Sequence, residues 1–271
     1  MKKTIVVSLG GNALSQSGKV SYHELVASLE NISHMLVQLV KKNYNLAIVF
    51  GSGPQVGALI LQNELAKKHI QPMPLDVLDA EVQGELGYLL EQALQNALQQ
   101  GKKKKAIVSV VTQVIVEKKD PAFKQPSKPV GQFLTRNQAK QLEKQGVAVR
   151  EDAGRGWRKV VPSPFPKKIN EATFIKKIVK DAIVIACGGG GIPVIEENGK
   201  MKGVEAVIDK DHAAALLANT IDAEALIIIT SVPSVYRNYG KKNQEPIQQM
   251  NIREAKKYLK EGHFLAGSMQ P

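Results

Sequence analysis

The sequence has a single cysteine, few aromatic residues and no long apolar run, and each shortage excludes a class of protein. Cys187 is the only cysteine in 271 residues, which excludes an intrachain disulfide framework and favours a reducing compartment. Aromatic residues make up 5% of the chain, too few for rows of base-stacking side chains. No apolar stretch is long enough to cross a bilayer, and the first residues lack the pattern of a secretory signal. We therefore expect a cytoplasmic protein with no membrane partner.

The chain is strongly basic, with a formal net charge of +12 at pH 7. Its lysines are scattered in short groups, such as Lys102 to Lys105 and Lys176 to Lys177, without interleaved aromatic residues. Such groups are usually solvated helix faces or loop ends, so we do not expect a nucleic-acid partner. The charge also suits a small anionic substrate.

Three apolar runs each end in a glycine loop. The runs and their loops are residues 5–9 with Gly10, Gly11 and Asn12; residues 46–50 with Gly51, Ser52 and Gly53; and residues 183–187 with Gly188 to Gly191. Each run has the composition of a buried strand, and glycines let a backbone approach an anion closely with its N–H groups. The recurrence predicts one phosphate-rich crevice.

Two common nucleotide-binding motifs do not fit these loops. The gap from Gly11 to Gly18 is too long for a Walker A loop, and Val20 stands where serine or threonine would follow the lysine. The spacing of Gly51, Gly53 and Gly57 is one residue too wide for a dinucleotide fingerprint. A Rossmann coenzyme is therefore disfavoured.

Helical periodicity alternates with the strands. Ser21 to Glu24 has the spacing of a capping box and opens a helix whose apolar residues share one face as far as Val40. The strand, helix, strand order with short connections predicts an α/β fold with a mainly parallel sheet. Further predicted helices are residues 56–67, 76–99, 136–144, 171–180, 213–221 and 252–260; further strands are 106–111 continuing through 114–116, 157–161 and a buried one at 225–229, with a hairpin turn at 196–200.

The stretch from Lys118 to Lys168 interrupts this alternation. It holds six of the thirteen prolines and few long apolar runs. We interpret it as a small protruding subdomain, of the kind that excludes water from a phosphoryl-transfer site. The predicted division is an N-terminal lobe over residues 1–117, a lid-like subdomain over 118–168 and a C-terminal lobe over 169–271.

Histidine and cysteine give no metal-binding pattern. The five histidines have no ligand spacing, so a zinc site is not expected. No histidine lies near Cys187 in the sequence, and we interpret this cysteine as a small buried apolar residue. We assign no metal-ligating residue.

Several charged residues have structural interpretations that stay open. Asp209 and Asp211 could each cap the helix that follows them. Lys128 could be a surface lysine between two prolines. Arg155 and Arg158 could pair with Glu151 and Asp152 to brace the subdomain, which we prefer to contact with a substrate.

Eight motifs along the chain carry a resemblance to one known family. They are Leu9–Leu14, Gly53–Gly57, Thr112–Val114, Asp120–Phe123, Lys128–Gly131, Glu151–Arg158, Cys187–Pro193 and Gly203–Asp211. In content and order they resemble the carbamate kinases, nearly from end to end. The resemblance implies the amino acid kinase fold, a three-layer αβα open sandwich that works as a homodimer. It also implies reversible phosphoryl transfer between ATP and carbamate, giving ADP and carbamoyl phosphate, with Mg²⁺.

The resemblance also assigns roles to residues. On the carbamate or carbamoyl phosphate side, in the N-terminal lobe, it places Gly10, Gly11, Asn12, Gly51, Ser52 and Gly53. Lys128 reaches from the subdomain toward the transferred phosphoryl group, and Asp211 orients the lysines and the metal. Lys210, Thr230 and Tyr236 lie on the nucleotide side, in the C-terminal lobe. Because carbamate is already an oxyanion, no general base is needed, and cations with backbone N–H donors must offset the charge.

Two positions depart from the family pattern. Ser52 stands where the family usually has asparagine, so one side-chain amide is lost while a hydroxyl can still donate. Gln270 replaces a glycine, and the sequence stops at Pro271, before a lysine that normally contacts the transferred phosphoryl group. The resemblance therefore implies that the family's C-terminal segment is absent from this sequence.

The sequence leaves other functions open beside carbamate kinase activity. One is a dimer that binds nucleotide or carbamoyl phosphate without turnover. Another is a kinase that acts on a different small acid within the same fold. Nucleic-acid binding ranks last, and a steep loss of affinity with salt would be its mark.

Overall fold

The computed structural model describes residues 2–14, 21–151, 156–230, 232–264 and 269. The chain divides into two compact units, residues 1–229 and 230–271. No helix in the described ranges is long and apolar enough to cross a membrane.

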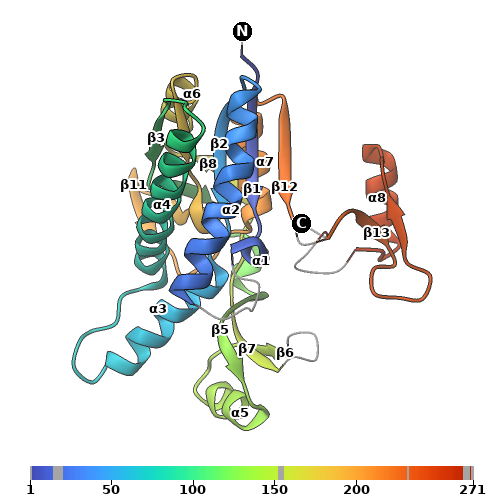
Figure 1. Ribbon diagram of the computed structural model, residues 1–271. Helices are drawn as coiled ribbons and strands as arrows, with labels where there is room; N and C mark the ends of the chain where they lie inside the picture. Colours follow the sequence, from blue (N-terminus) through green and yellow to red (C-terminus); the bar gives the residue numbers. More distant parts are fainter. Residues whose placement is uncertain (1, 15–20, 152–155, 231, 265–268, 270–271) are drawn as a thin grey trace. The chain divides into compact units, whose positions relative to one another are not determined.

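The first unit is built on a five-stranded sheet in which all neighbouring strands are parallel (Figure 1). The order is β12-β1-β2-β9-β3. The strands are β1 (Thr4–Leu9), β2 (Asn45–Phe50), β3 (Ala106–Ser109), β9 (Ala182–Ile185) and β12 (Ala225–Ile229). Because the strands are parallel, the connections between them return the chain to the end of the sheet at which every strand starts. The predicted α/β class with a mainly parallel sheet is confirmed.

Helices cover both faces of this sheet because its strands are apolar on both sides. Along β1, Val7 and Leu9 face the cluster that contains α2 (Tyr22–Lys41) and α4 (Leu75–Gln100), which lie side by side. Val6 faces the opposite cluster, with α6 (Ala172–Ile178) and α7 (Lys210–Thr220). Successive strand side chains point to opposite faces, so one strand serves both clusters. The result is the predicted three-layer αβα arrangement.

The predicted strand from 106 to 116 is wrong in its middle, because it is divided between two sheets. β3 ends at Ser109, and β4 (Gln113–Val116) belongs to a second sheet of order β11-β10-β4-β8. The other members are β8 (Pro166–Ile169), β10 (Ile192–Glu197) and β11 (Lys200–Gly203). An apolar run does not identify its pairing partners, so residues 110–112 looked like strand in the sequence. The predicted hairpin turn joins β10 to β11.

The proline-rich stretch contains a small antiparallel sheet of order β5-β7-β6 and the helix α5 (Figure 1). Its elements are β5 (Lys128–Leu134), α5 (Arg136–Lys144), β6 (Val149–Glu151) and β7 (Trp157–Val161), preceded by a short 3₁₀ turn at Pro121–Phe123. α3 (Gly53–Ala66) packs on β5, where a Cβ on Gly57 would lie 2.9 Å from the Cα of Gly131. The boundaries at residues 117 and 168 stay predictions.

β12 is less buried than its apolar sequence suggested. It is the outermost strand of the sheet order, and Ile228 is 44% exposed. An outer strand pairs on one side only, so a composition that indicates burial for an inner strand does not do so here.

The second unit holds β13 (Val235–Arg237) paired antiparallel with β14 (Glu245–Ile247), and the predicted helix near residues 252–260. That helix is α8 (Ile252–Lys260), which opens with a capping box between Asn251 and Glu254. Its high content of charged residues fits the absence of buried side chains along it.

Candidate functional site

The glycine loops that follow β1 and β2 touch at the carboxyl ends of their strands. The N–H of Gly51 donates to the carbonyl of Leu9 at 2.9 Å. A Cβ on Gly51 would lie 3.3 Å from the backbone nitrogen of Gly11 and 3.0 Å from Cδ of Lys210. Two predicted substrate-side loops and a predicted catalytic lysine therefore meet at one place. The N–H of Gly10 donates to the carbonyl of Ile229 at 3.3 Å, at the end of the neighbouring strand β12.

The four-glycine loop after β9 packs between the β2 loop and the approach to α7. A Cβ on Gly189 would lie 2.6 Å from Oγ of Ser52. A Cβ on Gly190, whose φ is +101°, would lie 2.3 Å from the carbonyl oxygen of Ile208. Real Cβ atoms do not come this close, so a side chain at either position would displace a neighbour. This loop therefore sets the spacing between Ser52 and the residues before α7.

Two lysine–aspartate pairs lie at the N-terminus of α7. Nζ of Lys128 is 2.6 Å from Oδ2 of Asp209, and Nζ of Lys210 is 2.6 Å from Oδ1 of Asp211. The hydroxyl of Ser8, in β1, donates to the same Oδ1 at 2.9 Å. Lys128 comes from β5 in the small sheet, so the Lys128–Asp209 pair connects the proline-rich stretch to the N-terminus of α7. The three predicted catalytic residues, Lys128, Lys210 and Asp211, are thus adjacent.

Asp209 has two roles where the sequence suggested one. Its Oδ1 accepts the N–H of Asp211 at 2.9 Å, which is the predicted helix cap, while Oδ2 holds Lys128. Burial by itself would raise the pKa of Asp209, but Lys128, the N–H of Asp211 and nearby His212 hold that pKa below its usual range. The carboxylate is therefore charged and fixed in place. Lys128 is only 29% exposed, unlike a solvated surface lysine.

Ser8 and the ion-pair role of Asp209 were missed by sequence reasoning. Ser8 is a buried polar residue inside an apolar strand, and that interruption is the signal that could have identified it. Asp209 and Lys128 are 81 residues apart, and nothing local indicates their contact.

Some predicted site residues are described only in part. Gly11 begins the short helix α1 (Gly11–Leu14), and the side chain of Asn12 lies outside the described part of the structure. Ser52 is 4% exposed and precedes Gly53, at which a Cβ would meet nothing within 4 Å. Arg155 also lies outside the described residues, and Arg158 donates from Nε to the carbonyl of Gly131 at 3.1 Å.

Thr230 and Tyr236, predicted on the nucleotide side, belong to the second unit. Thr230 is exposed, and the ring of Tyr236, in β13, lies 5.7 Å from the ring of Tyr239. Their assignment to the nucleotide stays a prediction.

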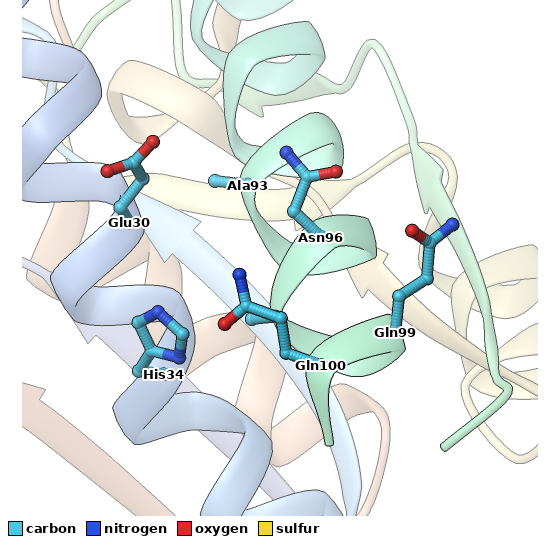
Figure 2. Close-up of a pocket in the computed structure, with 7 residues that line it drawn as sticks. Glu30, His34, Ala93, Asn96, Gln99 and Gln100 are labelled. Carbon is cyan, nitrogen blue, oxygen red and sulfur yellow. The ribbon is translucent and has the colours of Figure 1, made fainter. Parts of the chain in front are cut away.

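A surface cavity of about 260 Å³ lies away from the glycine loops, between α2 and α4. Figure 2 shows Glu30 and His34 on α2 opposite Asn96 and Gln100 on α4. None of the predicted site residues lines it, so this cavity is not the candidate site. Within the described ranges no group of three or more His, Cys, Asp or Glu side chains has an arrangement that could hold a metal.

The sequence matches known proteins over its whole length. The model of the amino acid kinase family matches residues 3–271. Carbamate kinase from Pyrococcus horikoshii is 46% identical over 276 residues, which cover 100% of this chain and 88% of that protein. The chain belongs to the carbamate kinase family. Carbamate kinase 1 from Enterococcus faecium agrees, with 47% identity over 100% of this chain and 87% of its own length.

Solved carbamate kinase structures have the same fold. That of Giardia lamblia carbamate kinase bound to AMP-PNP superposes with a TM-score of 0.90 at 42% identity, over 100% of this chain and 87% of the other. The same enzyme bound to citric acid gives a TM-score of 0.93 at 41% identity, with coverage of 100% and 86%. N-acetylglutamate synthase from Neisseria gonorrhoeae, at 15% identity and a TM-score of 0.53, shares the fold alone. The amino acid kinase fold is thus confirmed.

Proposed function

We propose that this chain catalyses reversible phosphoryl transfer between ATP and carbamate, giving ADP and carbamoyl phosphate. The observation that carries the proposal is the pair of lysines, Lys128 and Lys210, held by Asp209 and Asp211 beside the glycine loops. Its further support is the carbamate kinase name of relatives that are 46% and 47% identical over the full chain.

The residues suit a reaction that needs positioning rather than proton transfer. An oxygen of the carbamate anion forms a bond to the γ-phosphorus while the bond from that phosphorus to the bridging oxygen of ADP breaks. Carbamate carries no proton that must leave, so no general base is required. Catalysis then depends on alignment and on offsetting the charge of the transferred group.

Each group has a defined part in this scheme. The N–H groups of Gly10 and Gly51 already donate to backbone carbonyls, so Gly11 and Gly53, the first residues of α1 and α3, supply the N–H groups for the carbamate or carbamoyl phosphate oxygens. The hydroxyl of Ser52 is a further donor. Lys128 approaches the transferred phosphoryl group from β5, and Lys210, with its stem against Gly51, approaches it from α7. Asp209 and Asp211 fix both lysines before substrate arrives, which reduces the reorganisation needed in the transition state.

The carboxylate of Asp211 fits a magnesium ion that is brought in with the nucleotide. Lys210 and Ser8 both bind Oδ1 of Asp211, so Oδ2 carries neither of these two hydrogen bonds. Mg²⁺ is typically held by one or two carboxylates together with substrate phosphates, and a cluster of protein ligands is not needed. When bound, the ion would neutralise the nucleotide phosphates; Asp211 is the residue that would hold it.

Other parts of the proposal rest on the family resemblance. We propose that the chain works as a homodimer in the cytoplasm. We also propose the three-part division, with residues 1–117 on the carbamate side, 118–168 as a lid-like subdomain and 169–271 on the nucleotide side.

The test is ATP formation from ADP, Mg²⁺ and carbamoyl phosphate by the purified 271-residue chain. Turnover that requires all three supports the proposal. A folded chain that binds ADP in calorimetry yet forms no ATP would replace it with the non-catalytic binding function. A panel of small acids with ATP would reveal a different acceptor.

A further inference from the structure

Gln83 of α4 is a buried amide whose side chain forms hydrogen bonds to two separate backbone segments. It is 4% exposed. Its Oε1 accepts the N–H of Thr112 at 2.8 Å, and its Nε2 donates to the carbonyls of Thr112 at 3.2 Å and of Gly188 at 3.1 Å. One side chain thus joins the segment after β3 to the first glycine of the loop after β9.

Thr112 extends this set of contacts to Cys187. Its hydroxyl donates to the carbonyl of Val110 at 2.7 Å and accepts the N–H of Cys187 at 3.0 Å. Residues 110–112 carry the chain from the main sheet to the second sheet, so Thr112 takes no part in the hydrogen-bond ladder of the main sheet. A buried backbone N–H without an acceptor is costly, and Oε1 of Gln83 is the acceptor for the N–H of Thr112.

The far side of the glycine loop contacts both halves of the candidate site. Gly189 lies against Ser52, and Gly190 lies against the carbonyl of Ile208, which precedes Asp209. A displacement of Gly188 would therefore move the loop that separates Ser52 from the lysine–aspartate pairs.

We propose that Gln83 is a positioning residue, which fixes residues 187–191 so that the Ser52 loop and the N-terminus of α7 keep the separation that phosphoryl transfer requires. This inference rests on the proposed function. Gln83 reaches the site through the glycine loop alone and takes no part in the bond changes.

Two substitutions separate the acceptor from the donor of Gln83. Gln83→Met keeps the approximate volume and removes both, whereas Gln83→Glu keeps an acceptor and, when ionised, removes the donors to two carbonyls. We expect kcat of both variants at pH 8 to fall on the order of 10²-fold, with a smaller change in KM for ADP, because a misplacement of about 1 Å suffices for such a loss. Leu90→Val, two turns along the same helix and in the core, is the control for lost packing.

The pH profile of Gln83→Glu provides a readout that a loss of packing would not change. The introduced carboxyl group, once protonated, regains one O–H donor, so the activity of this variant relative to the original chain should rise as pH falls from 8 to 6, while that of Gln83→Met stays constant. The titratable groups nearby are Asp79, which is buried one turn earlier on α4, the Cys187 thiol, Glu171, which accepts the N–H of Gln113, and Glu91, which accepts the N–H of Ser109. Taking the ratio to the original chain at each pH removes the titration that these groups show in every variant, and Gln83→Met reports it without a second carboxylate beside Asp79. A ratio that is the same at all pH values for Gln83→Glu would overturn the donor role.

Backbone amide exchange tests the inference even if the chain forms no ATP. Within the loop, the N–H of Gly190 donates to Cys187 and that of Gly191 to Gly188, each at 3.0 Å, and Ile192 donates to Thr112 at 2.9 Å. Gln83→Met should speed exchange in the peptide that holds residues 187–192 at least tenfold over Leu90→Val, with β1 unchanged. Equal exchange in the two variants would overturn the proposal. Absence of ATP formation by the original chain, with faster loop exchange in Gln83→Met, would refute the proposed function and leave the structural part of this inference standing.

Discussion

Lys128 and Asp209 form an ion pair at 2.6 Å although 81 residues separate them in the chain. The contact joins β5 of the small sheet to the residue that caps α7. A lysine that could have been solvated is thereby held at the carboxyl edge of the main sheet, next to the glycine loops.

Replacing Lys128 by alanine should reduce turnover far more than nucleotide binding. Loss of one preorganised charge donor costs on the order of 10²–10³ in rate, by analogy with an oxyanion donor. Steady-state ATP formation gives kcat, and calorimetry gives the affinity for ADP. Lys144→Ala, which removes an exposed lysine at the end of α5, is the matched control and should keep the original turnover. Unchanged turnover in Lys128→Ala would refute the assigned role.

Asp209→Asn should separate the cap of α7 from the ion pair, because asparagine still caps a helix while it no longer carries charge. Asp209→Ala should lose a further ~1 kcal/mol of unfolding free energy with the cap. The folded pKa of Asp209 is lowered, so its stabilising contribution is complete above the unfolded pKa of about 3.9 and is lost as pH falls through the folded pKa. The difference in denaturant midpoint between the original chain and Asp209→Asn should therefore shrink on acidification, and a constant difference would contradict the ion-pair role.

Asp79→Asn should stabilise the protein increasingly as pH rises. Both carboxylate oxygens of Asp79 are buried without a hydrogen-bond partner among the described residues, and burial, with Asp76 and Glu205 nearby, raises its pKa well above the ordinary value. The folded state then holds this proton more tightly than the unfolded state, so stability falls as pH rises from about 3.9 toward the folded pKa. Urea unfolding at several pH values measures the effect. Glu81→Gln, which neutralises an exposed carboxylate on the same helix, controls for net charge. A gain in unfolding free energy that is the same at every pH in Asp79→Asn would show that the buried carboxyl group does not titrate as its raised pKa requires.

Gly190→Ala should destabilise the fold more than Gly199→Ala. Both glycines have positive φ, +101° and +72°, so both variants incur backbone strain, typically about 1–2 kcal/mol for a left-handed residue. Only at Gly190 does a Cβ also meet a backbone oxygen, 2.3 Å away, whereas at Gly199 it meets nothing within 4 Å. Thermal unfolding of the two variants isolates the steric part. Equal shifts in Tm would show that the loop can move away from Ile208.

Local patterns predicted most of the elements. The apolar stripe behind Ser21 indicated the helix α2, and the apolar runs after residues 4, 45 and 182 indicated three strands, which the structure shows to be parallel neighbours. These patterns succeed because helix and strand periodicities are properties of neighbouring residues.

The relations that position the site are not local. The division of β3 from β4 depends on which sheet each half pairs with, and the partner of Lys128 depends on where the start of β5 meets the N-cap of α7. The glycine loops were visible as loops, but their packing order, with Gly189 against Ser52 and Gly190 against Ile208, is a tertiary fact. Motif resemblance identified Lys128, Lys210 and Asp211, whereas Ser8 and Gln83 became visible only from their contacts.

The close approach of Gly57 and Gly131 has a mechanical consequence for Lys128. The two backbones touch where α3 packs on β5, and Lys128 lies three residues before Gly131, at the start of that strand, about 10 Å away at the rise of an extended chain. If β5 tilted by roughly 6° about the contact at Gly131, Lys128 would move by about 1 Å. A displacement of about 1 Å is enough to reduce the rate on the order of 10²-fold. The position of a charged group at the start of the strand thus depends on the absence of side chains at two glycines, one in the middle of that strand and one on α3.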